Sequence, residues 1–448
     1  LAFKGYHNYK KSLKFFKRIE ASQDLQINHP DYLFHIAELY KGLGDYKNAN
    51  NYFEKYSRIN RDTKSFKYLK SKNEIKNHKR VLALNSDIVN VAVKNIGKQI
   101  NTVLSEYYPV WLNDSSILYS TLRATEVTKE GVIKDETYSI QIFKGTKRDS
   151  VWHEAGFVFA KELKGISFTD GSFDVNGDFY FSKQRENLNY QLVKSRLILK
   201  ASVSINGDSI YNLNMDTVFD VKFSEEDASF NFRNPFVFTS KGKKYILFSS
   251  NRLGGRGKMD LWYSELKKGV WTAPKNLGPK VNTPGDEIGP NYNLNTDKFY
   301  FASDWHYGLG GLDLFEAIGL WKRPTSVLNL GIPFNSSSND LYISPLDSIK
   351  GLFTSSRTGS QTYKDAACCN DLYTYNYPVI DSTLNKIVEV LSRDSIIKKL
   401  QRLVKEFHVT LYFHNDRPNP NNWDTITPYN YMDTYESYLD SIPNYHVQ

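Results

Sequence analysis

The chain is poor in the residues that build metal and redox sites. Its 448 residues include two cysteines and nine histidines, and these match neither the spacing of zinc ligands nor the HExxH pattern of a metalloprotease. No run approaches the ~18 consecutive apolar residues that a membrane-spanning helix needs. The sequence therefore predicts no metal site, no cofactor and no transmembrane span in this chain.

The patterns of common enzyme classes are missing as well. The runs Gly308–Gly311 and Arg252–Gly255 join expected strands rather than opening a helix after a strand, so they are not phosphate loops. No histidine stands in a triad with a nucleophile elbow. Asp286 and Glu287 are adjacent, and neighbouring residues of a strand point apart, which favours a structural role over acid–base chemistry. We predict no catalytic residue.

One segment resembles the start of a calcium loop. Asp174-Val175-Asn176-Gly177-Asp178 has the spacing of the first ligands, but Arg185 stands where a bidentate Glu is expected. A hairpin turn is the favoured interpretation.

An internal repeat is the strongest feature that is present. Lys94-Asn95-Ile96-Gly97, Asn101-Thr102, Glu106 and Pro109 recur as Lys275-Asn276-Leu277-Gly278, Asn282-Thr283, Glu287 and Pro290, each residue 181 positions later. Two parts of the chain therefore copy one structural unit, which is the signature of a repeat architecture.

Five short β-rich runs extend this unit. Each is preceded by a turn rich in Asn, Asp, Gly or Lys and followed by a second strand, and their aromatic anchors are Tyr119, Phe181, Phe248, Phe301 and Phe353. Turn residues supply positive φ, and aromatic and β-branched residues favour strands, so each unit is predicted to form one antiparallel blade. The pattern predicts a β-propeller of five blades. A sixth blade built from Leu199–Phe232 is the alternative.

The two ends of the chain have a different character. Ala37, Gly44, Ala49 and Phe53 carry the small and aromatic residues of a tetratricopeptide repeat, and the helix-like pattern of Asp394–Phe407 has one apolar face. The predicted fold is therefore mainly β with an α-helical N-terminal segment. The predicted domains are tetratricopeptide-like helical hairpins at 1–82, the propeller at 83–380, a helical linker at 381–408 and a further domain at 409–448.

The basic charge is concentrated at the N-terminus. Residues 1–80 hold 18 Lys and Arg against 8 Asp and Glu, a net charge of +10, whereas the whole chain carries +9. A solvated helical surface is one interpretation, and a docking face for an acidic partner or an anionic envelope polymer is the other. No nucleic-acid-binding module is visible. The candidate partner-binding residues are Lys10, Lys14, Arg18, Lys47, Lys55, Arg58, Lys67 and Lys70.

Several of these motifs together resemble a known family. The segments Phe248–Trp262 and Ser303–Phe315 resemble WD-like (TolB-type) propeller repeats of outer-membrane-associated proteins of Bacteroidota, and Val409–Pro418 resembles the opening strand of an OmpA-like domain. Helical repeats, a propeller and an OmpA-like start resemble the PorE-type components of the type IX secretion and gliding apparatus. That type has a small regulatory β-domain for which this chain has no room between Pro378 and Val409.

The resemblance implies a location and partners. It implies a protein of the periplasm at the outer membrane, a lipoprotein or secreted precursor whose N-terminal signal lies outside this sequence. Its partners would be other subunits of an envelope complex, and peptidoglycan would bind through the rest of the OmpA-like domain.

Cys368 and Cys369 are adjacent and precede the last expected strand, and family members carry a similar pair there. Two free thiols and a vicinal disulfide, which an oxidising periplasm would permit, are the two interpretations.

Two functions follow as hypotheses. The first is a non-enzymatic periplasmic scaffold that links an envelope machine of the type IX secretion or gliding kind to its partners and to the cell wall. It is preferred because helical repeats precede the propeller and an OmpA-like segment follows it. The alternative is a propeller enzyme, a lyase or a glycosidase acting on envelope polysaccharide, with paired carboxylates at the mouth of the funnel.

Overall fold

The structure is a computed structural model of the 448-residue chain. It describes residues 8–86, 88–124, 138–157, 166–203, 209–215, 219–223, 229–361 and 369–378. The chain divides into two compact units, Leu1–Pro378 and Val379–Gln448. The predicted linker at 381–408 and the OmpA-like start at 409–448 lie outside the described residues.

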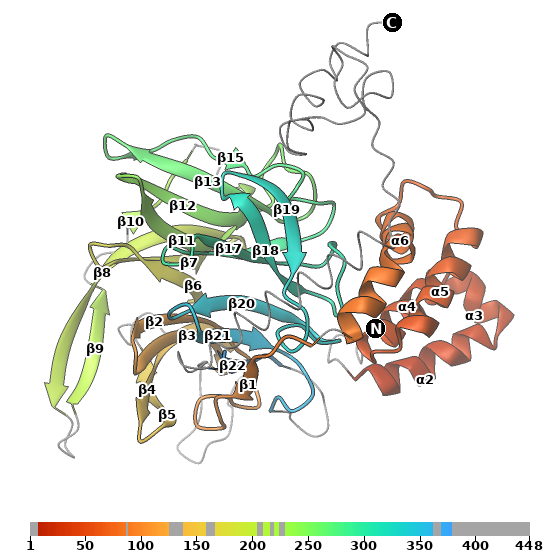
Figure 1. The fold of residues 1–448 in the computed structure, drawn as a ribbon, viewed down its shortest axis with the longest axis horizontal. Coiled ribbons are helices and arrows are strands. Elements are labelled where there is room, and N and C mark those ends of the chain that lie inside the picture. Colours follow the sequence, from red (N-terminus) through yellow and green to blue (C-terminus); the bar gives the residue numbers. More distant parts are fainter. Residues whose placement is uncertain are drawn as a thin grey trace, which may run out of the picture. The chain divides into compact units, whose positions relative to one another are not determined.

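The described part of the first unit opens with five helices (Figure 1). Side-chain caps begin two of them: the Asn8 carboxamide accepts the Lys11 N–H at 3.2 Å, and the Asp45 carboxylate accepts the Asn48 N–H at 3.1 Å. Ala37 is fully buried where one helix meets the next, so a small residue there permits close packing. The helices are α2 (Tyr9–Glu20), α3 (Gln23–Asn28), α4 (Tyr32–Gly42), α5 (Tyr46–Ile59) and α6 (Phe66–Ser86).

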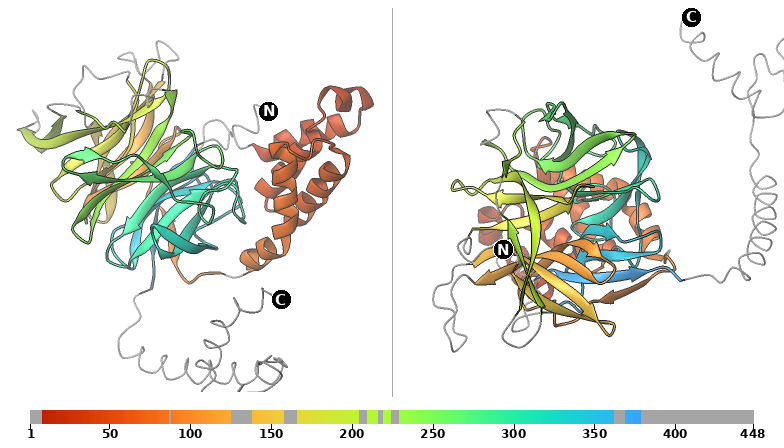
Figure 2. Two further views of the ribbon diagram at one scale, coloured as in Figure 1. Left: turned by 90° about the horizontal axis from the view of Figure 1, so that it is seen from above. Right: turned by 90° about the vertical axis from the view of Figure 1, so that its left-hand side faces the viewer.

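The rest of the unit is a five-bladed β-propeller, as the sequence predicted (Figures 1 and 2). Blade 1 is β2 (Glu106–Asn113), β3 (Ser116–Ala124), β4 (Tyr138–Arg148) and β5 (Val151–Phe157). Blade 2 is β6 (Phe168–Phe173), β7 (Asp178–Gln184) and β8 (Tyr190–Val203), with β9 (Ser209–Met215) and β10 (Phe219–Asp220) both pairing with β8. Blade 3 is β11 (Phe232–Ser240), β12 (Lys243–Ser250), β13 (Asp260–Lys267), β14 (Val270–Trp271) and β15 (Lys275–Asn276). Blade 4 is β16 (Glu287–Asn293), β17 (Lys298–Ser303), β18 (Asp313–Leu320) and β19 (Arg323–Asn329). Blade 5 is β20 (Asp340–Pro345), β21 (Lys350–Ser355), β22 (Asp371–Asn376) and β1 (Ala92–Asn95).

The ring is closed by strands from its two ends. The strand β1, which precedes blade 1 in sequence, pairs antiparallel with β22 of blade 5, with Ala92 opposite Asn376 and Asn95 opposite Tyr373. This pairing confirms the expectation that the segment before the first blade completes the last one. It also removes two sheet edges that would otherwise be exposed.

The alternative of a sixth blade is wrong. Residues of the Leu199–Phe232 stretch form the end of β8, all of β9 and β10, and these strands join the sheet of blade 2. The stretch therefore extends one blade as a long hairpin and builds no separate one.

The five aromatic anchors lie where the sequence placed them. Each is in the second strand of its blade, and each is at most 1% exposed. They pack in clusters that combine neighbouring blades; one cluster joins Phe238 and Tyr245 of blade 3 with Phe299 and Phe301 of blade 4. The core therefore runs between the blades around the ring. Within the described residues, no helix is both long and apolar enough to cross a membrane.

Candidate binding site at the propeller axis

The repeat found in the sequence is a latch that ties one blade to the next. We define a blade latch as three sequence elements. The first is Asn-x-Gly, the second is Asn-Thr or Asn-Ser with its Asn six residues after the first Asn, and the third is a Glu or Asp four residues after that Thr or Ser. In one copy the Asn282 carboxamide accepts the Leu261 N–H at 2.8 Å and donates to the Leu261 carbonyl at 2.9 Å. Asn101 makes the same two bonds with Leu372. Each latch therefore joins the third strand of one blade to the start of the next.

The structure shows a third copy that our sequence analysis missed. Asn329-Leu330-Gly331, Asn335-Ser336 and Asp340 form the latch between blades 4 and 5, where the Asn335 carboxamide makes both bonds with Leu314. Ser and Asp replace the Thr and Glu of the other copies, so the third copy differs from the repeat found in the sequence. The six-residue spacing of Asn329 and Asn335, which is the same in all three copies, could have identified it.

The acidic residue of each latch is fully buried and holds its own loop. Glu287 accepts the Thr283 N–H at 2.7 Å and the Ser303 hydroxyl at 2.8 Å, and Glu106 accepts the equivalent bonds from Thr102 and Thr121. Burial raises the pKa of Glu287, whereas these hydrogen bonds favour the charged form and lower it. Burial is the larger effect, and the pKa rises to about 8. The structural role predicted for Glu287 is confirmed, and these carboxyls are closed to a substrate.

The inner strands share a second feature, a β-bulge at the same place in every blade. Each bulge shifts the register of the inner strand against its neighbour and holds one residue at positive φ, between 54° and 62°. Such bulges re-aim side chains and are frequent beside functional sites. The five residues are Tyr108, Asp170, Asn234, Gly289 and Tyr342.

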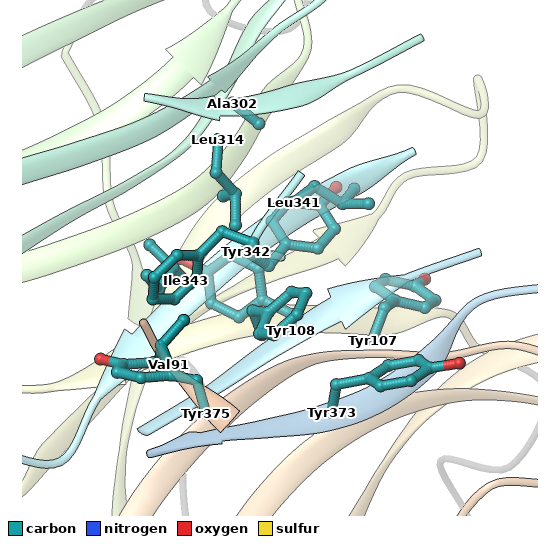
Figure 3. Packing of buried hydrophobic residues seen from close by; sticks show 12 residues of the cluster. Val91, Tyr107, Tyr108, Ala302, Leu314, Leu341, Tyr342, Ile343, Tyr373 and Tyr375 are labelled. Carbon is teal, nitrogen blue, oxygen red and sulfur yellow. The ribbon is translucent and has the colours of Figure 1, made fainter. Parts of the chain in front are cut away.

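Hydrogen bonds connect the bulges around the axis. The Asn234 N–H donates to Asp170 Oδ2 at 3.3 Å, the Gly289 N–H donates to Asn234 Oδ1 at 3.3 Å, and Arg233 Nε lies 3.4 Å from Asp170 Oδ2. A Cβ on Gly289 would lie 2.5 Å from the Tyr342 ring, so only glycine fits there. The rings of Tyr108 and Tyr342 have centroids 4.9 Å apart (Figure 3). Polar and aromatic side chains thus fill the middle of the axis.

Beyond the bulges, the ends of the inner strands enclose a pocket of about 320 Å³. All five blades contribute to it, and none of the described residues that line it is charged, although 24% of the chain is. Its aromatic residues are Tyr108, Trp111, Phe173, Phe236, Tyr292 and Tyr342, and its amides are Asn291, Asn293 and Asn295. We call this site the axial pocket.

The axial pocket offers ring faces and unused amides. Trp111, Phe173 and Phe236 are half-buried, and the Trp111 indole N–H donates to the Ser344 carbonyl at 2.9 Å, which fixes the ring. Within the part of the chain that the structure describes, the side chains of Asn291 and Asn295 have no hydrogen-bond partner, and Asn295 is exposed. The pocket can therefore stack against a ligand and hydrogen-bond to it without carrying charge.

Two aspartates form a separate acidic pair at the other end of β16. Asp286 precedes that strand, and its N–H donates to Asp304 Oδ1 at 2.8 Å. Lys258 Nζ lies 3.7 Å from Oδ2 of each aspartate, so the two carboxylates are within twice that distance of each other. Burial and then the charge of Asp304 raise the pKa of Asp286. Both side chains are partly exposed, at 30% and 24%.

Six of the eight basic residues chosen from the sequence are exposed, and two are not. Lys10, Lys14, Arg18, Lys47, Lys55 and Arg58 are exposed on α2 and α5. Lys67 is half-buried and pairs with Asp31, while Lys70 is buried against the propeller, where it donates to the Asp304 carbonyl and lies 2.8 Å from Glu74. Lys70 is therefore not available to an external partner.

The calcium-like segment of blade 2 is a hairpin turn, as favoured. Asp174 accepts the Asn176 and Asp178 N–H groups at 2.8 and 2.9 Å and pairs with Lys244.

Of the cysteine pair before the last strand, Cys369 is disulfide-bonded. Cys368, the other cysteine of the chain, lies outside the described residues.

Neither a protein-family model nor a curated protein matches the chain. Distant likeness is found among solved structures. A mutant levansucrase of Bacillus subtilis is 13% identical over 61% of this chain and 83% of its own, with a TM-score of 0.36. A mutant levansucrase of B. megaterium is 12% identical over 64% and 87%, with a TM-score of 0.40. A thermostable family-43 glycoside hydrolase is 12% identical over 62% and 90%, with a TM-score of 0.38.

The solved structures found are levansucrases and a glycoside hydrolase, and this finding contradicts the prediction of a non-enzymatic scaffold, which is withdrawn. The likeness is too distant to transfer a substrate or the role of any residue, so the proposals below rest on the geometry of this chain.

Proposed function

We propose that this protein acts on a neutral glycan, which it holds in the axial pocket. The observation that carries the proposal is the lining of that pocket, which combines half-buried aromatic rings and unpaired amides and, among the residues that the structure describes, includes no charged side chain. Aromatic faces pack against the C–H faces of a sugar ring, and a carboxamide can donate to one hydroxyl and accept from another.

The absence of charge in the lining argues against other small ligands. A phosphate or carboxylate ligand is normally held by Arg, Lys or a helix N-terminus, and an ammonium ligand by a carboxylate. Within the described ranges of the chain, none of these groups lines the axial pocket. A small apolar ligand that covered the half-buried Asn291 would leave its carboxamide without a partner, whereas the hydroxyls of a sugar would satisfy it.

A direct binding measurement tests this proposal. Titration calorimetry with a panel of neutral mono- and oligosaccharides should show binding, and Trp111→Ala should weaken it about tenfold or more, because one stacked aromatic contributes roughly 1–2 kcal/mol. Tyr138→Ala is the matched control, since Tyr138 is an exposed aromatic at the start of β4, away from the pocket. Binding only of anionic sugars, or equal affinity in Trp111→Ala, contradicts the proposal.

A glycosidic-bond-cleaving enzyme is the second candidate, and the Asp286–Asp304 pair is the observation that favours it. Asp286 has a raised pKa, as a general acid requires, and Asp304 is its nearby carboxylate. Glycosidases use two carboxyls about 5 Å apart when they retain configuration and roughly 6.5–9.5 Å apart when they invert it. The Lys258 bridge limits the separation of the two Oδ2 atoms to at most twice the 3.7 Å of each Lys–Asp contact, so the pair is not too far apart for either mechanism.

Hydrolysis assays separate the second candidate from the first. Release of reducing sugar from soluble polysaccharides should fall at least a hundredfold in both Asp286→Asn and Asp304→Asn, because each removes one of the two carboxyls. Asp114→Asn, in an exposed turn of blade 1, is the control. Activity that survives both substitutions excludes this pair as the catalytic centre.

We further propose the cellular setting from the sequence resemblance. The helices α4 and α5 pack together through Ala37, Ala49 and Phe53 in the manner of a tetratricopeptide hairpin, which supports a helical repeat. A PorE-type, periplasmic protein at the outer membrane would meet peptidoglycan and other envelope glycans beside partner subunits. Fractionation of cells with an antibody to this chain, with periplasmic and cytoplasmic markers, tests the location.

A further inference from the structure

A second cavity lies between blades 4 and 5 and adjoins the axial pocket. It has a volume of about 310 Å³, and Asn293 and Ile343 line both cavities. The turns Asn293–Lys298 and Pro345–Lys350 form parts of its wall, so both cavities lie at the same end of the inner strands. We call this cavity the side subsite.

The side subsite contains polar groups that the protein leaves unused. The Thr296 Oγ1 atom is buried and has no hydrogen-bond partner. Among the described residues, the hydroxyls of Tyr300, Tyr375 and Tyr377 likewise make no hydrogen bond. Buried polar groups are normally paired, so the Thr296 hydroxyl is an exception. The three tyrosine hydroxyls are not closed off from solvent, so they are free to hydrogen-bond to a ligand that carries donors and acceptors.

Charged groups in the side subsite are already balanced. Lys298 Nζ lies 3.0 Å from Glu316 Oε2, and Lys350 Nζ lies 3.7 Å from Asp347 Oδ2. Carboxylates in such pairs keep lone pairs that accept hydrogen bonds from hydroxyl groups, and lysine keeps N–H donors. The subsite therefore favours a polyhydroxylated ligand over one with a net charge.

We propose that the axial pocket and the side subsite form one continuous site for a neutral oligosaccharide of at least two sugar units. This inference rests on the proposed function and extends it, because it assigns the second sugar to the tyrosines between blades 4 and 5. The shared residue Asn293 stands at the junction of the two cavities. Its Nδ2 donates to the Asp347 carbonyl at 3.3 Å, which ties the turn of blade 4 to that of blade 5.

Chain-length dependence of binding is the test. Calorimetry with a monosaccharide and with its di- and trisaccharide should show at least a tenfold gain in affinity from one unit to two. Tyr377→Ala should reduce the affinity for the disaccharide to that for the monosaccharide. Tyr300→Phe removes one hydroxyl while keeping the ring that packs in the core, and it should lower the disaccharide affinity several-fold.

The outcomes distinguish this inference from the proposed function. If the monosaccharide binds in a Trp111-dependent way but longer chains bind no tighter, the side subsite is wrong and the axial pocket stands. If the gain is present but insensitive to both tyrosine substitutions, the second sugar lies elsewhere and the inference is again wrong. If no saccharide of any length binds, both fail. Thermal unfolding of each variant shows that it is folded.

Discussion

At the residue scale, one asparagine in each blade latch acts as a substitute peptide group. The Asn282 carboxamide both accepts from the Leu261 N–H and donates to the Leu261 carbonyl, and its Nδ2 also donates to Asn276 Oδ1 at 2.8 Å. All of these atoms are buried or half-buried. Asn282 precedes β16, the first strand of blade 4. The latch therefore gives hydrogen-bond partners to the backbone of β13 from the segment that leads into the next blade.

We expect Asn282→Ala to destabilise the protein by about 2 kcal/mol. The substitution leaves the buried N–H of Leu261 without its partner, whereas the Leu261 carbonyl still accepts the Leu277 N–H at 3.1 Å. One unsatisfied buried group costs roughly 1–3 kcal/mol. Urea unfolding followed by tryptophan fluorescence measures the loss. Asn51→Ala, on the exposed side of α5, should change the free energy of unfolding by less than about 0.5 kcal/mol. A loss as small in Asn282→Ala would mean that the latch is dispensable.

At the scale of elements, the helix α6 is joined to the propeller through an ionic cluster. Glu74 Oε1 lies 2.8 Å from both Lys41 Nζ of α4 and Lys70 Nζ of α6. Asn73 donates to the Trp305 carbonyl at 2.6 Å, and the rings of Phe66 and Trp305 have centroids 5.3 Å apart. One carboxylate thus compensates two buried lysines where the helices contact blade 4.

Glu74→Gln should cost about 3 kcal/mol, because breaking a buried ion pair leaves an uncompensated charge. Burial alone would raise the pKa of Glu74, but Lys41 and Lys70 outweigh it and lower the pKa to about 2 from 4.5. A lowered pKa gives stability that is present above pH 4.5 and lost as the pH falls toward 2.

Urea unfolding between pH 6 and pH 2 should therefore show a steeper acid loss in the wild type than in Glu74→Gln. Glu54→Gln, at the surface of α5, is the control for a carboxylate pair that is solvent-exposed. Equal acid sensitivity of Glu74→Gln and the wild type would refute this account of Glu74.

The same scale shows what the sequence could predict. The strands and the closure by β1 were predictable because aromatic runs and turn residues are local signals, and Tyr119, Phe181 and Phe353 occupy equivalent strands. The bulges were not, because Tyr108, Asp170, Asn234 and Gly289 share no side-chain type. Their positive φ follows from the register between strands, which is a non-local property.

At the scale of the whole molecule, the candidate site belongs to no single blade. The axial pocket takes residues from all five inner strands, so it exists only when the ring is closed by β1 and β22. A sequence motif cannot encode such a site, since its members are spread from Tyr108 to Leu346. The latches and the closing strand thus hold together the surface on which the proposed function depends.

Ligand binding should consequently protect all five blades together. A saccharide that binds only the folded state at a hundred times its Kd adds about 2.7 kcal/mol to the free energy of unfolding. Hydrogen exchange should then slow in the second halves of β2, β6, β11, β16 and β20 upon addition of saturating saccharide, because the ligand contacts each of them. In Trp111→Ala the same saccharide concentration should give little protection. Protection confined to one blade would place the sugar on the side of the propeller and contradict an axial site.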